Sequence, residues 1–175
     1  MSETPASGLR WAGLLHDEAG TEACARAIAP LLEGGDVVAL WGDLGAGKTV
    51  FARALVQALA GMVEVPSPTF NLVLTYEPQD PAAPMIWHFD LYRLEKAEEA
   101  YELGIEEAFD DAISVIEWPG NLGHYLPRHR IDVHLRTGPA EGQRAIEISV
   151  PGPFKARFEQ AMTGLGFKKM NREPT

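Results

Sequence analysis

Apolar residues recur along this chain in two spacings, one typical of strands and one typical of helices. Short apolar or alternating stretches predict strands at residues 9–15, 37–41, 67–76, 84–90, 112–117, 131–136 and 144–150. Amphipathic spacing predicts helices from Thr21 to about 32, from Phe51 to Leu59, over 94–111 and from Pro153 to Met162. Helices that alternate with strands, followed by a late hairpin, predict an α/β fold with three layers and a central mixed sheet.

Residue types at the ends of these segments indicate where the elements start and stop. Thr21, with Glu22 beside it, is typical of a helix start. Pro30 falls inside the first helical pattern, so we expect a kink or an early stop there. Gly61 is expected to close the second helix, and Gly104 to interrupt the third. We expect one domain over residues 1–175, with a core at about 9–163 and a frayed, flexible tail at 168–175.

Amino-acid composition limits the cellular compartment and the classes of binding partner that we expect for this chain. The 175 residues include 25 acidic and 15 basic side chains, a net charge of -10, so a strong unaided grip on nucleic acid is not expected. The single cysteine, Cys24, excludes an internal disulfide and favours a reducing compartment. No apolar stretch approaches the roughly 20 residues that span a bilayer, and the start MSETPASGLR lacks the features of a secretory signal. These features predict a cytoplasmic protein without a membrane partner.

A glycine-rich stretch lies between a predicted strand and a predicted helix. It reads Gly42, Asp43, Leu44, Gly45, Ala46, Gly47, Lys48, Thr49 and matches the phosphate-binding loop pattern. Glycines allow backbone N–H groups to surround phosphate oxygens, and the following helix directs its positive end to the same place. Lys48 would face the β- and γ-phosphates, and the Thr49 hydroxyl would bind Mg²⁺. The loop therefore predicts a nucleoside triphosphate site in a P-loop NTPase-like fold.

Two acidic residues stand at the ends of predicted strands. Asp90 follows "IWHF" and Glu117 follows "ISVI". Ligands of open α/β sheets lie beyond the carboxyl ends of the strands, so both carboxylates can reach the Mg²⁺ region near Thr49. One would hold the metal, and the other would complete its shell or orient the attacking water. The alternative for each is a solvated acid at a strand end.

The nucleotide is expected to be ATP. A guanine-reading N/T-K-x-D element is absent, and "DLYR" rather than D-x-x-G follows the candidate metal strand. A small-molecule kinase shares this loop and size, but its arginine-rich lid is not recognisable here. Mg²⁺-dependent ATP hydrolysis and phosphoryl transfer to a metabolite both remain open at this point.

Four ordered motifs together carry a family resemblance. "GDLGAGKT", "SPTFNLVLTY", "HFDLYRL" and "IEWP" resemble the TsaE family over about residues 16–150. The resemblance implies a small ATPase with a central mixed sheet that hydrolyses ATP weakly alone. It also implies that the protein acts with the TsaD and TsaB subunits, which form threonylcarbamoyladenosine at position 37 of tRNA. Its contact with tRNA would then be indirect, through these subunits. ATP hydrolysis would reset that complex rather than drive the transfer.

The resemblance also implies roles for individual residues. Gly45 to Thr49 would hold the phosphates, Thr69 would take a switch-like position near the γ-phosphate, and Asp90 and Glu117 would act at the metal. Trp118 would lie at the edge of the site or be an ordinary half-buried aromatic. His88 is expected to be a strand residue with a satisfied ring rather than a base. At the outer end of the nucleotide, the turn from His16 to Thr21, which includes Glu18, would face the base and Arg144 would approach the nucleotide, or else both would be surface residues.

Three functions therefore stay open from the sequence. The first is a partner-activated ATPase serving tRNA modification, and the second is a metabolite kinase. The third is a nucleotide-sensing partner protein whose hydrolysis is incidental. Turnover in the presence of a TsaD–TsaB preparation, compared with a panel of metabolites, separates them.

Overall fold

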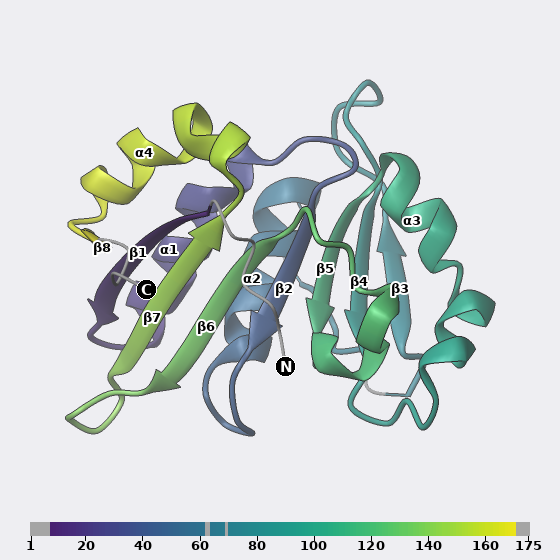
Figure 1. Ribbon diagram of the computed structural model, residues 1–175, viewed down its shortest axis with the longest axis horizontal. Helices are drawn as coiled ribbons and strands as arrows, with labels where there is room; N and C mark the ends of the chain where they lie inside the picture. Colours follow the sequence, from purple (N-terminus) through teal and green to yellow (C-terminus); the bar gives the residue numbers. More distant parts are fainter. Residues whose placement is uncertain (1–7, 62–63, 69, 171–175) are drawn as a thin grey trace.

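The fold is built on one mixed β-sheet (Figure 1). The structure is a computed structural model that describes residues 8–61, 64–68 and 70–170. Within these residues the sheet has eight strands in the order β3-β4-β5-β2-β6-β7-β1-β8. The strands are β1 Leu9–Leu15, β2 Val37–Trp41, β3 Val73–Tyr76, β4 Ile86–Asp90, β5 Ile113–Glu117, β6 Ile131–Thr137, β7 Arg144–Val150 and β8 Lys168–Met170.

The middle of the sheet is parallel and its two sides are antiparallel. The four central strands β4, β5, β2 and β6 are parallel to one another, while β3 pairs antiparallel with β4. β6 and β7 form the predicted antiparallel pair, with Asp132 opposite Ser149. The carboxyl ends of β2, β4 and β5 therefore meet at one edge, where a parallel sheet places its ligands.

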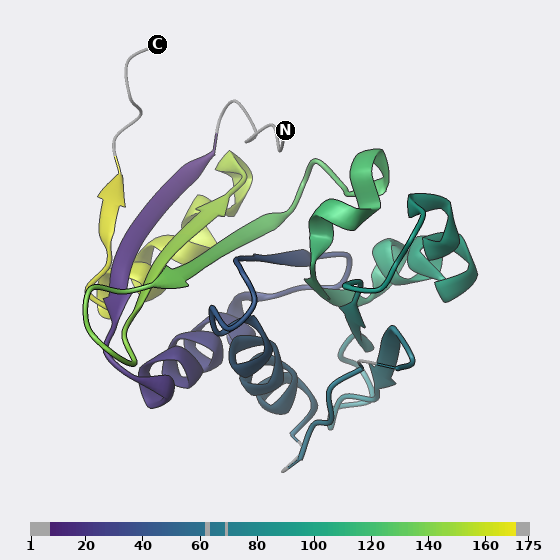
Figure 2. The same ribbon diagram turned by 90° about the horizontal axis from the view of Figure 1, so that it is seen from below.

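Helices cover both faces of the sheet (Figure 2). α1 (Glu18–Ile28), α2 (Lys48–Ala60) and α4 (Lys155–Gly164) contribute buried side chains to one apolar cluster with the sheet. α3 (Ile105–Asp111) and the 3-10 segments Ala97–Leu103 and Pro119–Tyr125 form a second cluster over β4, β5 and β2. Short 3-10 turns, Ala29–Leu31 and Gly152–Phe154, complete the helical segments. The expected three-layer α/β sandwich with a mixed sheet is confirmed.

Glycine and proline positions were informative about where elements end. The 3-10 turn that contains Pro30 follows directly after α1, which is the early stop expected there. Gly61 closes α2 in the left-handed conformation with φ of +68°, and Gly104 separates a 3-10 segment from α3 with φ of +85°. Each of these turn signals depends on a single glycine or proline, so it can be recognised from the sequence without knowledge of the fold.

The start of the first helix was predicted wrongly. α1 begins at Glu18, and the side chain of Asp17 accepts a hydrogen bond from the N–H of Gly20 at 2.8 Å. Thr21 lies inside the helix, 2% exposed, and its hydroxyl donates to the carbonyl of Asp17 at 3.4 Å. Asp and Thr are both good N-cap residues, so two candidates four residues apart competed.

The third strand is shorter than the alternation over residues 67–76 suggested. β3 starts at Val73, and the side chain of Phe70 is 85% exposed rather than turned inward. Leu72 has a left-handed backbone with φ of +60°, and its N–H donates to the carbonyl of Pro68 at 2.9 Å. A turn therefore replaces the first part of the expected strand.

Part of the predicted tail belongs to the sheet. Lys168–Met170, assigned to a frayed tail, forms β8 and pairs antiparallel with β1, with Trp11 opposite Lys169. The three residues of β8 are all exposed and show no alternation of apolar and polar side chains. The sequence therefore gives no indication that they pair with β1. The rest of the expected tail, 171–175, lies outside the described residues.

No helix within residues 8–61, 64–68 and 70–170 is long and apolar enough to cross a membrane.

Cys24 should be inert towards thiol reagents in the folded protein. Its side chain is fully buried in α1, and burial raises the pKa of the thiol to about 12, so almost no thiolate exists at pH 8. We expect negligible labelling by a disulfide reagent in native buffer and complete labelling in guanidinium chloride. Rapid stoichiometric labelling of the native protein would contradict the buried position.

Candidate nucleotide site

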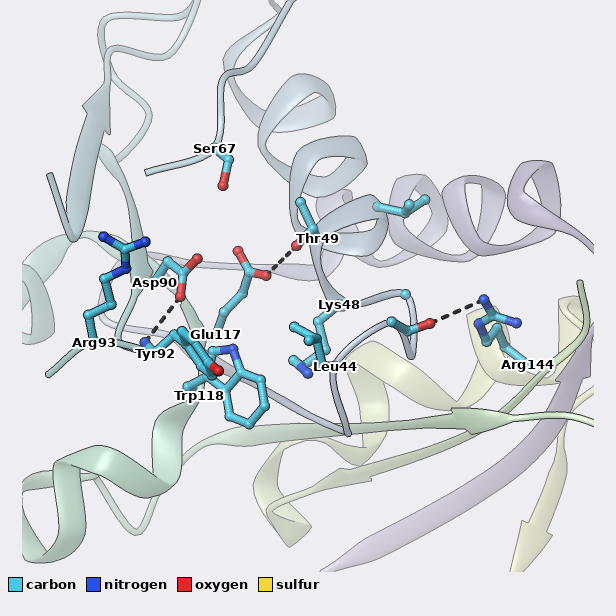
Figure 3. Close-up of a pocket in the computed structure, with 13 residues that line it drawn as sticks. Leu44, Lys48, Thr49, Ser67, Asp90, Tyr92, Arg93, Glu117, Trp118 and Arg144 are labelled. Carbon is cyan, nitrogen blue, oxygen red and sulfur yellow. Dashed lines mark hydrogen bonds between the residues drawn. The ribbon is translucent and has the colours of Figure 1, made fainter. Parts of the chain in front are cut away.

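A pocket of about 450 Å³ opens at the carboxyl ends of the central strands, beside the start of α2 (Figure 3). The glycine loop with the start of α2, the segments at the ends of β4 and β5, and two further segments contribute residues to it. Its lining residues are Leu44, Gly45, Gly47, Lys48, Thr49, Val50, Ser67, Asp90, Tyr92, Arg93, Glu117, Trp118 and Arg144. The polar groups come from five separate parts of the sequence, so folding brings them together.

The backbone of the loop has a form that requires glycine. Gly42, Gly45 and Gly47 all have positive φ angles. A Cβ atom on Gly42 would lie 2.5 Å from the carbonyl oxygen of Leu135, and Gly47 caps α2 with φ of +104°. Around Gly45 a Cβ would meet no atom within 4 Å, so the loop leaves open space on its pocket side. This is the open, glycine-lined loop at a helix N-terminus that accommodates phosphate groups.

Lys48 is held within the loop. Its Nζ donates to the carbonyl oxygens of Gly42 and Asp43, the second at 2.8 Å, and lies 4.0 Å from the centre of the Trp118 ring. The residue is 5% exposed, and this burial lowers the pKa of the ammonium, against the opposing influence of Glu117 and the other nearby carboxylates. Lys48 is thus a cation fixed beside the glycine loop, where the sequence predicts that phosphate groups bind.

Glu117 links the loop to the sheet. Its Oε1 accepts a hydrogen bond from the hydroxyl of Thr49 at 2.8 Å, and its Oε2 lies 2.8 Å from Nε2 of His88. Glu117 is 1% exposed and His88 is fully buried. Figure 3 shows the Glu117 side chain reaching from β5 to the first turn of α2. A buried carboxylate is thereby fixed against the hydroxyl that the loop pattern assigns to Mg²⁺.

Asp90 stands next to Glu117 because the two residues are paired in the register of β4 and β5. Its carboxylate accepts a hydrogen bond from the N–H of Tyr92 at 3.2 Å. Burial raises the pKa of the Asp90 carboxyl, and the charge of Glu117 adds to the rise, while the Tyr92 N–H acts in the opposite direction. A cation placed between the carboxylates would relieve this repulsion.

The donor set suits Mg²⁺ bound together with phosphates. No group of three or more His, Cys, Asp or Glu side chains suited to a metal occurs within the described ranges. Mg²⁺ commonly takes one or two carboxylates and keeps waters and substrate phosphate oxygens as its other ligands. Thr49, Asp90 and Glu117 supply hard oxygen atoms of that kind on the pocket wall. The residues present therefore fit a magnesium–nucleotide complex.

A second, smaller pocket of about 130 Å³ adjoins the first. Glu18, Thr21, Gly47, Val50, Gly142 and Arg144 line it. Arg144 lines both pockets, and its guanidinium donates to the carbonyl oxygen of Gly45 at 3.2 Å. Glu18 and Arg144, which the sequence analysis assigned to the outer end of a nucleotide, thus lie in one pocket beside the loop.

The structure brings most of the predicted site residues together, at different depths. Leu44 is 79% exposed at the rim, whereas Ala46 is buried at 4% beneath the loop, and its N–H donates to the carbonyl of Asp43. Gly42 and Asp43 line a neighbouring pocket of about 220 Å³ rather than the main one. Thr69 lies outside the described residues.

Sequence reasoning gave no role to three of the polar residues that line the main pocket. Ser67, Tyr92 and Arg93 line it but were given no role. Figure 3 shows the Ser67 hydroxyl pointing towards Asp90 and Glu117. Ser67 belongs to the "SPTF" stretch, and Tyr92 and Arg93 stand two and three residues after Asp90, so their closeness to motif residues was the available signal.

The sheet order, the loop geometry and the polar pocket at the strand ends define a P-loop NTPase-like α/β protein. The family model described as "Threonylcarbamoyl adenosine biosynthesis protein TsaE" matches residues 15–146. The chain belongs to the TsaE family.

Named relatives agree with this assignment. The chain is 42% identical over 123 residues to the tRNA threonylcarbamoyladenosine biosynthesis protein TsaE of Rickettsia felis, covering 70% of each chain. It is 32% identical over 145 residues to the protein of the same name from Bacillus subtilis, covering 82% of this chain and 87% of that one. A solved structure titled as Bacillus subtilis YdiB superimposes with a TM-score of 0.64 at 24% identity, over 91% of this chain and 95% of the other. This last likeness supports the fold.

Proposed function

We propose that this protein binds ATP with Mg²⁺ and hydrolyses it as a component of the machinery that forms threonylcarbamoyladenosine in tRNA. In this proposal it acts with TsaD and TsaB subunits in the cytoplasm. The observation that supports ATP hydrolysis best is the contact of the Thr49 hydroxyl with Glu117 at 2.8 Å, directly after the glycine loop. The pathway is supported by family membership, because the relatives named above carry that description.

The residues of the chain divide the work between binding and hydrolysis. The loop amides from Gly45 to Thr49 and the Lys48 ammonium would hold the phosphates, because donors and a cation converge there. Bound Mg²⁺ would neutralise phosphate charge, with Thr49 and one of the two carboxylates, Asp90 or Glu117, as its protein-side oxygen groups. The carboxylate that does not hold the metal would orient water for attack on the γ-phosphate.

The small pocket around Glu18 and Arg144 would receive the nucleoside end of ATP. It adjoins the phosphate loop through Gly47 and Val50, which line both pockets. A nucleotide whose phosphates lie at Gly47 would extend its ribose and base in that direction. Arg144 already contacts the loop at Gly45, so its guanidinium is close enough to meet the sugar or the α-phosphate.

Protein partners, rather than this chain, would provide most of the binding affinity for tRNA. The net charge is -10, and phosphate neutralisation by Lys and Arg dominates the affinity of proteins for nucleic acid. The pocket offers Lys48, Arg93 and Arg144, which suits a triphosphate better than an extended RNA backbone.

ATP turnover should rise when the partners are present. We expect a TsaD–TsaB preparation to raise turnover at least about 10-fold, about 1.4 kcal/mol in the barrier, because a weak ATPase leaves part of its site to be completed by partners. Phosphate release is measured for the chain alone, with the partners, and with a panel of small metabolites. Stimulation by one metabolite with a phosphorylated product, and none by the partners, would instead identify a kinase.

A further inference from the structure

His88 is an unusual residue for its position in the fold. It lies in the middle of β4, 0% exposed, on the same face as Asp90, and is paired in register with Leu74 and Val115. Its Nε2 lies 2.8 Å from Oε2 of Glu117, whereas Nδ1 is buried without a hydrogen-bond partner in the described part of the chain. The prediction of a fully hydrogen-bonded His88 ring therefore holds for Nε2 but not for Nδ1.

An apolar side chain would be the ordinary choice at such a site. Burying an imidazole costs free energy unless its nitrogen atoms are paired, and here one is not. The hydrogen bond that the ring does make goes to a carboxylate at the proposed catalytic centre. A carboxylate accepts hydrogen bonds, so the hydrogen of the ring is on Nε2 and Nδ1 is the atom left without a partner.

We propose that His88 is a positioning residue, which holds the Glu117 carboxylate towards Thr49 and so supports Mg²⁺-dependent nucleotide binding and hydrolysis. This inference rests on the proposed ATPase function. The two oxygens of Glu117 are held from two sides, Oε1 by the hydroxyl of Thr49 and Oε2 by the ring of His88, each at 2.8 Å. A group that orients a ligand or its neighbour in this way affects metal binding without touching the metal.

Two amide substitutions separate positioning from packing. Gln at position 88 reaches as far as Nε2 and keeps a donor for Glu117, whereas Asn ends near the Nδ1 position and loses it. The measurement is the gain in ATP affinity on adding Mg²⁺, from titration calorimetry with Mg²⁺ and with EDTA. We expect His88→Asn to reduce this gain about 10-fold and His88→Gln to recover most of it. In EDTA both variants should bind ATP as wild type does, because the loop amides are unchanged.

Each outcome bears on the proposal. Equal gains in the Gln and Asn variants, or an undiminished gain in His88→Asn, would overturn it. Thermal unfolding of both variants checks folding, and His88→Leu, a donor-free residue suited to burial, replaces the Asn variant if that one does not fold. In a Glu117→Gln background, His88→Asn should reduce the gain no further, because the residue acts through Glu117. A wild-type protein without any Mg²⁺ gain would refute the proposed function itself, and so is distinguishable from a failure of this inference.

Discussion

Replacing Lys48 with alanine should lower ATP turnover at least about 100-fold, about 2.7 kcal/mol in the barrier. The amides of the loop and the N-terminus of α2 remain, but the cation that would face the β- and γ-phosphates is lost. The side chain is 5% exposed and bonded to the carbonyl of Asp43 at 2.8 Å, so it is placed before ATP arrives. Phosphate release under saturating ATP, with and without TsaD and TsaB, measures the effect.

Arg53→Ala is the matched control for this prediction. Arg53 is a cation on the same helix as Lys48, but it is exposed and lines none of the pockets around the loop. Its removal changes the net charge by the same amount and should leave turnover close to wild type. Near-normal turnover in Lys48→Ala would mean that the glycine loop is not the site of hydrolysis.

The fold was predictable from the sequence wherever the signal was local and buried. The strand over residues 113–117 is buried at every position, and up to Glu117 it reads as an apolar run that only Ser114 interrupts. The pair of β6 and β7 alternates on both strands and is joined by a turn-rich segment. Such patterns repeat within a few residues, so they are visible without knowledge of the partners in space.

The errors arose where the sequence offered competing or no local signals. Asp17 and Thr21 are both suitable helix caps, and which one acts depends on how β1 leads into α1. The alternation that includes Phe70 was interrupted by a turn at Leu72, a residue that carries no turn signal. β8 is held by backbone pairing to β1, which no side-chain pattern reports.

The candidate site was predictable in its parts but not in its contacts. The loop, Asp90 and Glu117 stand at strand ends, and the rule for ligands of open sheets places them together. The contact of Glu117 with His88 joins residues 29 apart in the sequence, and that with Thr49 joins residues 68 apart. These pairings depend on strand order, which became known only from the fold.

Glu117→Ala should reduce hydrolysis steeply while ATP affinity falls only modestly, by about 10-fold and only in Mg²⁺. We expect a loss of roughly 100-fold in the single-turnover rate, because the carboxylate matters most as charge moves in the transition state. In EDTA, ATP affinity should stay close to wild type, since the loop amides and Lys48 are intact. Because Ala leaves the half-buried hydroxyl of Thr49 and the buried ring of His88 without their shared acceptor, Glu117→Gln, which keeps the side-chain volume, is measured beside it.

Asp90→Ala should behave differently from the Glu117 variants, and this difference tests the division of roles between the carboxylates. If Asp90 is the closer contact of the metal and the phosphates, its removal weakens ATP binding in Mg²⁺ more than the removal of Glu117 does, and slows hydrolysis as well, but leaves binding in EDTA unchanged. Glu107→Ala, which removes an exposed acid on α3, should change neither quantity. Normal hydrolysis by Glu117→Ala, with or without partners, would show that the carboxylate at the end of β5 is structural and that Thr49 and His88 merely satisfy it.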